Sequence, residues 1–464
     1  MDNFVKFWSS NFLVQVFSKM ISFISNQLLV RSLDPSLFGI WSVRLALVQE
    51  TIVFWARDGI RKAASRSKNP HRFAILPFLI GLFVSPIIVY ISLKSAPEVE
   101  GYTMAVIMTA MSSIMELIGE MWAVPQLAVM DGSTTAKVSG PAFLIRSISS
   151  IILSKFFYKQ EGDPLPLMLC FGTSNIIFGL LIILGFYLRC GKPKIEFPTK
   201  NEYNAIKPFA FQTILQWLFS QGERIVLIAS NTPEQIGVYG FVSDISSLIA
   251  RLVFAPIEAA VFSMCASTAP LQFDMYSFIV RIVVYIGLCA AAFGPPLAPV
   301  VLQTVYSKRW SGDESKSAMS WFLRIMPFMA LNGVTEAFSN ARLSEKSLMY
   351  YNILLAIVSF IYFGLIFYLS KIYGTQGAIM ANGVNMILRS IMAITVISRE
   401  FKKFLSLFPN VIQLIAFGSL IYFQNSIRII YVLILSPFYG LMILFFERHS
   451  IKKLWNSLKS KKRD

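Results

Sequence analysis

The sequence is poor in the residues that form disulfide frameworks and metal sites. Its 464 residues include four cysteines, Cys170, Cys190, Cys265 and Cys289, and only two histidines. The cysteines are widely spaced and form no Cys-x-x-Cys pair, which argues against both a disulfide scaffold and a zinc site. We therefore expect no metal site, and nothing in the sequence calls for a cofactor.

Charged residues are also scarce, at 14% of the chain, where soluble domains carry about 25%. Hydrophobic residues make up 55%. A net charge of +17 would suggest nucleic acid as the partner of a soluble protein. In a membrane protein, basic loops instead set the orientation and favour anionic lipid headgroups. The composition predicts a polytopic membrane protein that contacts lipids and no nucleic acid.

Catalytic motifs are missing as well. The sequence has no Gly-rich phosphate loop, no Ser/His/Asp arrangement and no H-E-x-x-H. A membrane glycosyltransferase would need acidic residues in a sizeable loop, whereas the longest loops here are basic. We therefore expect the protein not to be an enzyme.

Long apolar stretches recur along the whole chain. Roughly 20 such residues cross about 30 Å of hydrocarbon as a helix. The pattern predicts an all-α polytopic membrane protein with about 14 transmembrane helices. Their expected ranges are 9–30, 37–56, 74–93, 102–124, 138–158, 167–188, 209–229, 236–262, 278–305, 317–338, 348–370, 375–397, 406–424 and 428–446. Prolines make the span 278–305 the least secure.

The loops differ in charge. Those after even-numbered helices, such as 57–72 and 189–207, hold most of the basic residues, whereas the opposite loops are short and acidic. The positive-inside rule then places both termini in the cytosol. The expected parts are an N-lobe (1–190), a basic cytosolic linker (191–207), a C-lobe (208–400), two further helices (401–447) and a basic cytosolic tail (448–464).

A short internal repeat relates the two lobes. Aligning Pro35 with Pro233 also aligns Gly39 with Gly237 and Trp41 with Tyr239. The matched positions are six spans apart, so we expect two six-helix lobes in parallel pseudo-repeat, followed by two C-terminal helices. Transporters built this way hold substrate between the halves and alternate access by rocking.

Ionisable residues inside apolar spans are the main functional signal. A charge at mid-membrane costs about 2.5–3.5 kcal/mol, so such residues face the bundle interior or a wet cavity. Glu116 and Glu120 share one face of a helix at i,i+4 spacing. The pair of spans between 208 and 261 is the most heavily charged, and it carries Glu223, Arg224, Asp244, Arg251 and Glu258.

Arginine in such a cavity suits a phosphate or pyrophosphate, because its planar fork binds phosphate oxygens in a bidentate manner. The candidate arginines are Arg44, Arg146, Arg224, Arg251, Arg57 and Arg61. The other candidate cavity residues are Glu116, Glu120, Glu223, Asp244, Glu258, Asn332, Glu336, Asn382 and Arg389. Interhelical ion pairs are the structural alternative, and for Arg57 and Arg61 headgroup contact is another.

Several segments together resemble the eukaryotic Rft family, along nearly the whole chain. They are VRLALVQETIVFWARDGIRKA (43–63), ELIGE (116–120), QGERIVL (221–227), GVYGFVSDISSLIARLVFAPIE (237–258), NGVTEAF (332–338) and GAIMANGVNMILRS (377–390). The sequence departs from the family in having Gly59 in the 43–63 segment, and no long lumenal insertion between helices 9 and 10.

The resemblance implies an endoplasmic-reticulum protein of the multidrug/oligosaccharidyl-lipid/polysaccharide exporter superfamily, related in fold to MurJ-type lipid flippases. The implied role is in N-glycosylation. A dolichol pyrophosphate-linked oligosaccharide, with five mannoses and two N-acetylglucosamines, would move from the cytosolic to the lumenal leaflet. The arginines would engage the pyrophosphate. Glu116, Glu120, Glu258 and Glu336 would bind sugar hydroxyls or orient the arginines.

Two other functions stay open at this point. One is a non-transporting accessory protein that associates with other N-glycosylation proteins. The other is a cation-coupled multidrug antiporter of the same superfamily, whose carboxylates would titrate with the coupling ion.

Overall fold

A computed structural model describes residues 30–31, 33–65, 67–128, 133–157, 163–249, 253–266, 273–306, 308–402, 404–424 and 429–460. In these ranges the regular structure is helical and includes no strand, which confirms the all-α prediction. The chain divides into two compact units between Ile225 and Val226, inside one long helix. The predicted lobe boundaries at 190 and 208 stay a prediction.

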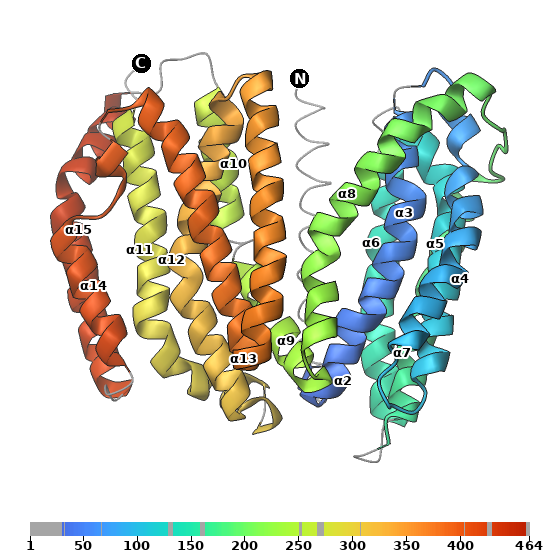
Figure 1. Ribbon diagram of the computed structural model, residues 1–464, viewed down its shortest axis with the longest axis horizontal. Helices are drawn as coiled ribbons and strands as arrows, with labels where there is room; N and C mark the ends of the chain where they lie inside the picture. The colour runs from blue at the N-terminus through green and yellow to red at the C-terminus, as the bar shows by residue number, and fades with distance from the viewer. Residues whose placement is uncertain are drawn as a thin grey trace. The chain divides into compact units, whose positions relative to one another are not determined.

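The first unit is a bundle of long helices (Figure 1). Its elements are α2 (Pro35–Gly39), the π-turn η1 (Ile40–Leu45), α3 (Ala46–Ala64), the 3₁₀ turn η2 (Pro70–Phe73), α4 (Leu76–Lys94), α5 (Tyr102–Ala128), α6 (Ser133–Phe157), α7 (Leu165–Cys190) and most of α8 (Lys200–Ser230). Helix α5 packs on α3, α4 and α7. Glycines allow this approach, since a side chain at Gly119 or Gly179 would meet α7 or α5 side chains.

The second unit is organised around α12, which packs on α9, α10, α11 and α13. Its elements are α9 (Pro233–Ile249), α10 (Ala255–Ala266), α11 (Phe273–Val301), the π-turn η4 (Leu302–Tyr306), the 3₁₀ turn η5 (Lys308–Trp310), α12 (Asp313–Arg342), α13 (Glu345–Glu400), the 3₁₀ turn η6 (Phe404–Leu407), α14 (Val411–Phe423) and α15 (Ile429–Ser460). Helices α14 and α15 both pack on α11.

The helices follow the predicted spans closely. Every predicted span from 37–56 onward overlaps a described helix, and the first, 9–30, lies outside the described residues. Among the described helices, seven are long and apolar enough to cross a membrane. The chain is therefore a multi-pass membrane protein, and the count of about 14 spans stays a prediction.

Within the predicted span 236–262, α9 ends at Ile249 and α10 begins at Ala255. Residues 250–252 lie outside the described residues, so the continuity of this span stays a prediction. Two other helix boundaries differ from the prediction. Helix α14 begins at Val411, not at residue 406, because Asn410 and Gln413 form a capping box there. Helix α15 continues to Ser460, so most of the predicted tail is helical.

Proline and glycine act differently in two spans. Pro295, Pro296 and Pro299 lie inside α11 without ending it, so the least secure span is continuous. Gly374 does break its helix: its φ of 57° and ψ of −136° interrupt α13 between the two predicted spans 348–370 and 375–397. This conformation suits glycine because a Cβ would be strained there.

The two prolines aligned in the repeat occupy equivalent places. Pro35 is the first residue of α2 and Pro233 the first of α9. Proline suits a first helical position, where its missing N–H leaves no hydrogen bond unmade.

Helix α8 begins within the predicted linker, where the Thr199 backbone N–H and hydroxyl donate to Glu202. These hydrogen bonds, and then Arg72, lower the pKa of Glu202.

Replacing Gly287 by alanine should destabilise the second unit. A Cβ at this buried α11 position would lie 2.6 Å from the Cα and 2.9 Å from the N of Pro327 in α12. Backbone cannot move aside as a side chain can, so overpacking should cost about 1–3 kcal/mol of unfolding free energy. Thermal unfolding of the purified protein measures this. The control is Gly364→Ala, where nothing lies within 4 Å and stability should stay level or rise. Equal melting temperatures would contradict the close approach.

Candidate functional site

Two arginines of α3 and two glutamates of α5 form an ion-pair ladder, which we call the α3–α5 ladder: Arg57, Arg61, Glu116 and Glu120. Arg61 donates from Nε and Nη2 to both oxygens of Glu120, at 2.8 and 2.6 Å. Arg57 donates to Glu116 at 3.0 Å and lies 3.9 Å from Glu120. The two arginines and the two glutamates each have i,i+4 spacing, so one face of α3 packs against one face of α5 with each arginine beside a glutamate.

The ladder is buried unevenly. The Glu120 side chain is 4% exposed and that of Glu116 is 15% exposed, whereas Arg57 and Arg61 keep 24% and 30%. The carboxylates are therefore more enclosed than the arginine side chains. For these four residues the structure favours the ion-pair interpretation, while leaving part of each arginine accessible.

Gln49 extends this cluster to α6. Its Nε2 donates to Glu116 at 3.2 Å, and its Oε1 accepts from Nη1 of Arg146 at 3.3 Å. The Arg146 guanidinium also lies 5.3 Å from the centre of the Phe178 ring, within cation–π range. Among the described residues no carboxylate lies within ion-pair distance of Arg146. Two glutamates and three arginines leave this cluster with one excess positive charge.

A second polar contact joins α3 to α8 within the first unit. Arg224 and Gln221 both donate to the same Glu50 oxygen, each at 2.7 Å. Beside them the indole N–H of Trp217 donates to the Thr51 hydroxyl at 3.1 Å. The Arg224 and Glu50 side chains are 35% and 45% exposed, so this pair is much more open than the ladder.

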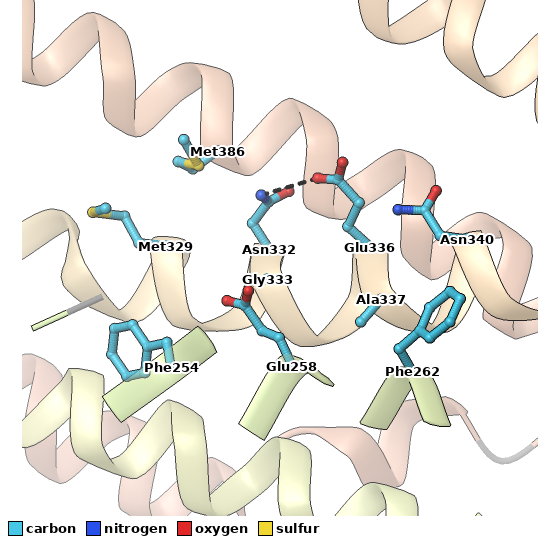
Figure 2. Close-up of a pocket in the computed structure, with 10 residues that line it drawn as sticks. All are labelled: Phe254, Glu258, Phe262, Met329, Asn332, Gly333, Glu336, Ala337, Asn340 and Met386. Atoms are coloured by element: carbon cyan, nitrogen blue, oxygen red, sulfur yellow. Dashed lines mark hydrogen bonds between the residues drawn. The ribbon is translucent and has the colours of Figure 1, made fainter. Parts of the chain in front are cut away.

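In the second unit, residues of α10, α12 and α13 line a cavity of about 560 Å³ (Figure 2). Glu258 and Glu336 both face it, and Glu336 accepts from Arg389 of α13 at 2.8 and 2.9 Å and from Asn332 at 3.3 Å. The carboxylate of Glu258 packs against Gly333, where any Cβ would overlap it. The structure thus brings four predicted residues together: Glu258, Asn332 and Glu336 line one pocket, and Arg389 binds Glu336.

The remaining predicted residues are Arg44, Asn382, Glu223, Asp244 and Arg251. Arg44 lies in η1, directly before α3, and donates to the backbone oxygen of Ser95 at 2.7 Å. Asn382 lies in α13, and its Oδ1 has no hydrogen-bond partner among the described residues. Glu223 and Asp244 both have interaction partners. Arg251 lies outside the described residues.

One buried polar cluster is absent from the sequence-based candidates. Arg281 of α11 donates to both oxygens of Glu447 in α15, at 2.6 and 3.0 Å, and to the Ser406 backbone oxygen at 2.6 Å. Tyr285 donates to Gln413 of α14 at 2.6 Å. Glu447 follows directly after the predicted span 428–446, and its place beside an apolar run is the signal that could have identified it.

Comparison with known proteins gives a consistent family and fold. The chain matches the model of the family described as Rft protein over residues 4–457. It is similar to proteins named Man(5)GlcNAc(2)-PP-dolichol translocation protein RFT1. That of Mus musculus is 25% identical, over 85% of this chain and 82% of that one. That of Dictyostelium discoideum is 24% identical, over 80% and 82%.

Solved structures share the fold at low identity. The lipid II flippase MurJ in an inward closed conformation matches with a TM-score of 0.68 and 13% identity, over 95% of this chain and 99% of that chain. An inward-facing multidrug resistance transporter of the MATE family matches with a TM-score of 0.53 and 17% identity, over 83% and 95%. The chain thus has the fold of MurJ and MATE transporters.

Proposed function

The chain belongs to the Rft protein family, and we propose that it flips a dolichol pyrophosphate-linked oligosaccharide of five mannoses and two N-acetylglucosamines across the endoplasmic reticulum membrane. Movement would run from the cytosolic to the lumenal leaflet, for protein N-glycosylation. The family match over residues 4–457 carries this proposal, with relatives named for that translocation. The fold shared with a lipid flippase supports it.

The substrate poses two recognition problems, and the chain has chemistry for both. Its pyrophosphate is an anion that must be held where water is scarce, and arginine remains charged there. Its glycan presents hydroxyls that donate to carboxylate and amide oxygens. Flipping breaks no covalent bond, so neither task needs a catalytic residue, and the named relatives are translocation proteins.

Arg146 is the arginine best suited to the pyrophosphate. In the α3–α5 ladder each guanidinium already donates to a carboxylate, which offsets its charge. Arg146 is instead positioned by a neutral amide, Gln49, and by an aromatic ring. The single excess charge of the cluster therefore lies at Arg146. Arg57 and Arg61, whose side chains are 24% and 30% exposed, would add positive charge near the same anion.

The proposed membrane orientation of the chain and its transport cycle are those expected from the sequence. With both termini in the cytosol, α3 runs from the lumenal side toward the cytosolic side, and the ladder lies toward its cytosolic end. Pyrophosphate would then be captured from the cytosolic leaflet, and alternating access of the two lobes would release it in the lumen.

Arg146→Gln should slow translocation of the pyrophosphate-linked glycolipid by about ten-fold or more, because a charge-assisted hydrogen bond to the anion is lost. The measurement uses purified protein in vesicles and labelled glycolipid. Accessibility of the glycan to an added lectin or enzyme reports which leaflet holds the lipid. The control, Lys155→Gln, removes a charge from an exposed position of the same helix and should leave the rate unchanged.

The same vesicles test the function itself. If wild-type protein moves no glycolipid in vesicles but still restores glycosylation in depleted cells, the flippase proposal is overturned and an accessory role is favoured. In cells, depletion should make the unglucosylated, five-mannose intermediate accumulate. Unchanged levels of every lipid-linked intermediate would contradict a role in this step.

A further inference from the structure

The acidic residues that could face a glycan differ in whether an arginine pairs with them. Glu116 and Glu120 receive hydrogen bonds from arginines of the ladder, and Gln49 donates to Glu116 as well. Their oxygens are therefore already used. Glu258, by contrast, has no hydrogen bond or ion pair with any residue that the structure describes. Acceptors free to bind a ligand are thus found in the second unit.

The cavity beside Glu258 is a groove with regular walls. On α12, Asn332, Glu336 and Asn340 recur every four residues, and Met329, Gly333 and Ala337 form the adjacent row. Opposite them Phe254 and Phe262 flank Glu258, again at four-residue intervals (Figure 2). Eight residues of helix rise about 12 Å, so the groove presents acceptors over that length.

The side-chain oxygen of Asn332 lacks a donor among the described residues. The residue is 7% exposed and lines the cavity. Its amide nitrogen must face Glu336, because a carboxylate only accepts, and the two are 3.3 Å apart. The Asn332 Oδ1 then has no hydrogen-bond partner among the described residues. A buried acceptor without a partner indicates a ligand or water that donates to it.

The size and walls of the groove distinguish a polyhydroxyl ligand from a bound cation. A cation draws its oxygen ligands to within about 2.3–2.6 Å of one point. Here the side-chain oxygens extend along one row of α12, with the Glu258 carboxylate opposite, beside a cavity of about 560 Å³. Within the described part of the chain, no cluster of three or more acidic, His or Cys side chains could hold a metal ion. Two phenylalanines beside a carboxylate offer apolar faces and acceptors together, as a sugar ring requires.

We propose that the groove lined by Phe254, Glu258, Phe262, Asn332 and Asn340 binds mannose residues of the translocated glycan. This inference rests on the proposed function. Glu258 accepts from sugar hydroxyls, Asn332 Oδ1 accepts one more, and the phenylalanines contact ring faces. Arg389 holds Glu336 and with it the Asn332 amide.

Two variants test the groove with different physical changes. Glu258→Gln removes the charge and keeps the shape. Gly333→Ala keeps the charge, but its methyl group displaces the Glu258 carboxylate. Gly364→Ala is the matched control, since it makes the same change in a helix where nothing lies within 4 Å. Thermal unfolding of each variant verifies that the fold is retained.

The assay compares two lipids in vesicles: polyprenyl pyrophosphate bearing one N-acetylglucosamine, and the same lipid bearing the five-mannose, two-N-acetylglucosamine glycan. Both groove variants should slow the mannosylated lipid by about ten-fold and leave the short one within two-fold, because the short lipid carries no mannose for the groove to bind. Equal slowing of both lipids would overturn the groove assignment. Failure of wild-type protein to move either lipid would overturn the proposed function instead.

A cation is tested in the same vesicles by replacing sodium and potassium with choline. Translocation by wild-type protein should be unaffected. If it stops, and Glu258→Gln no longer responds to the ions, the groove holds a cation and the sugar assignment is wrong.

Discussion

Arg61→Ala is expected to lower the free energy of unfolding by about 3–5 kcal/mol, the usual cost of leaving one partner of a buried ion pair alone. Arg61 supplies both oxygens of Glu120 with hydrogen bonds, and that carboxylate is 4% exposed. After the substitution the distant Arg57, 3.9 Å away, is the remaining cation near Glu120. A carboxylate without full compensation inside a membrane bundle is costly.

A double-mutant cycle separates the pair from its surroundings. Arg61→Ala combined with Glu120→Ala should be less damaging than the sum of the two single changes, because no charge is then left alone. Chemical or thermal unfolding in detergent or nanodiscs provides the free energies. The control is Arg72→Ala. Arg72 pairs with Glu196 and Glu202 at the surface, and its loss should cost about 1 kcal/mol or less. Additive single changes at the ladder would show that the two side chains are not coupled.

Glu447→Ala is expected to cost about 3–5 kcal/mol and to loosen the C-terminal helices. The Glu447 and Arg281 side chains are 6% and 15% exposed, and their two hydrogen bonds join α15 to α11. Arg281 also binds the backbone of η6, and Tyr285 binds Gln413 at the start of α14. One carboxylate therefore stabilises the contact of both final helices with α11.

Limited proteolysis locates this effect. With Glu447 replaced, cleavage around η6 and the start of α14 should be faster, while the first unit stays as resistant as in wild-type protein. The matched control is Glu400→Ala, which removes the carboxylate from a more exposed arginine pair with Arg342. Cleavage at the same rate in both variants would contradict a special role of Glu447 in holding α14 and α15.

Long apolar runs made the helices easy to predict, and special residues decided where they differ. The break at Gly374 separates two predicted spans as expected, since only a residue without a Cβ adopts that conformation readily. The start of α14 was misplaced because a capping box at Asn410 outweighs apolar residues before it. The prolines of α11 suggested a break, yet the helix continues through them, because neighbouring helices can support the freed carbonyls.

The candidate site was predicted as a set of residues and not as an arrangement. The i,i+4 spacing placed Glu116 and Glu120 on one face, and the structure confirms that the same partner helix meets both. For Arg57 and Arg61 the sequence leaves pyrophosphate binding, headgroup contact and interhelical ion pairs open, and in the structure both bind those glutamates. Glu447 and Arg281 were not among the candidates at all. Whether Arg146 binds pyrophosphate stays a prediction.

The sequence by itself determined the all-α class, the positions of most helices, the charges inside apolar runs and the family. Each of these depends on residues close together in the chain: apolar length, helical spacing and short motifs. Only the tertiary structure decided which charges neutralise one another and which stay available. Arg61 and Glu120 are 59 positions apart, and their contact depends on how α3 and α5 are rotated and aligned. Side chains from several helices set that alignment, and local periodicity does not contain it.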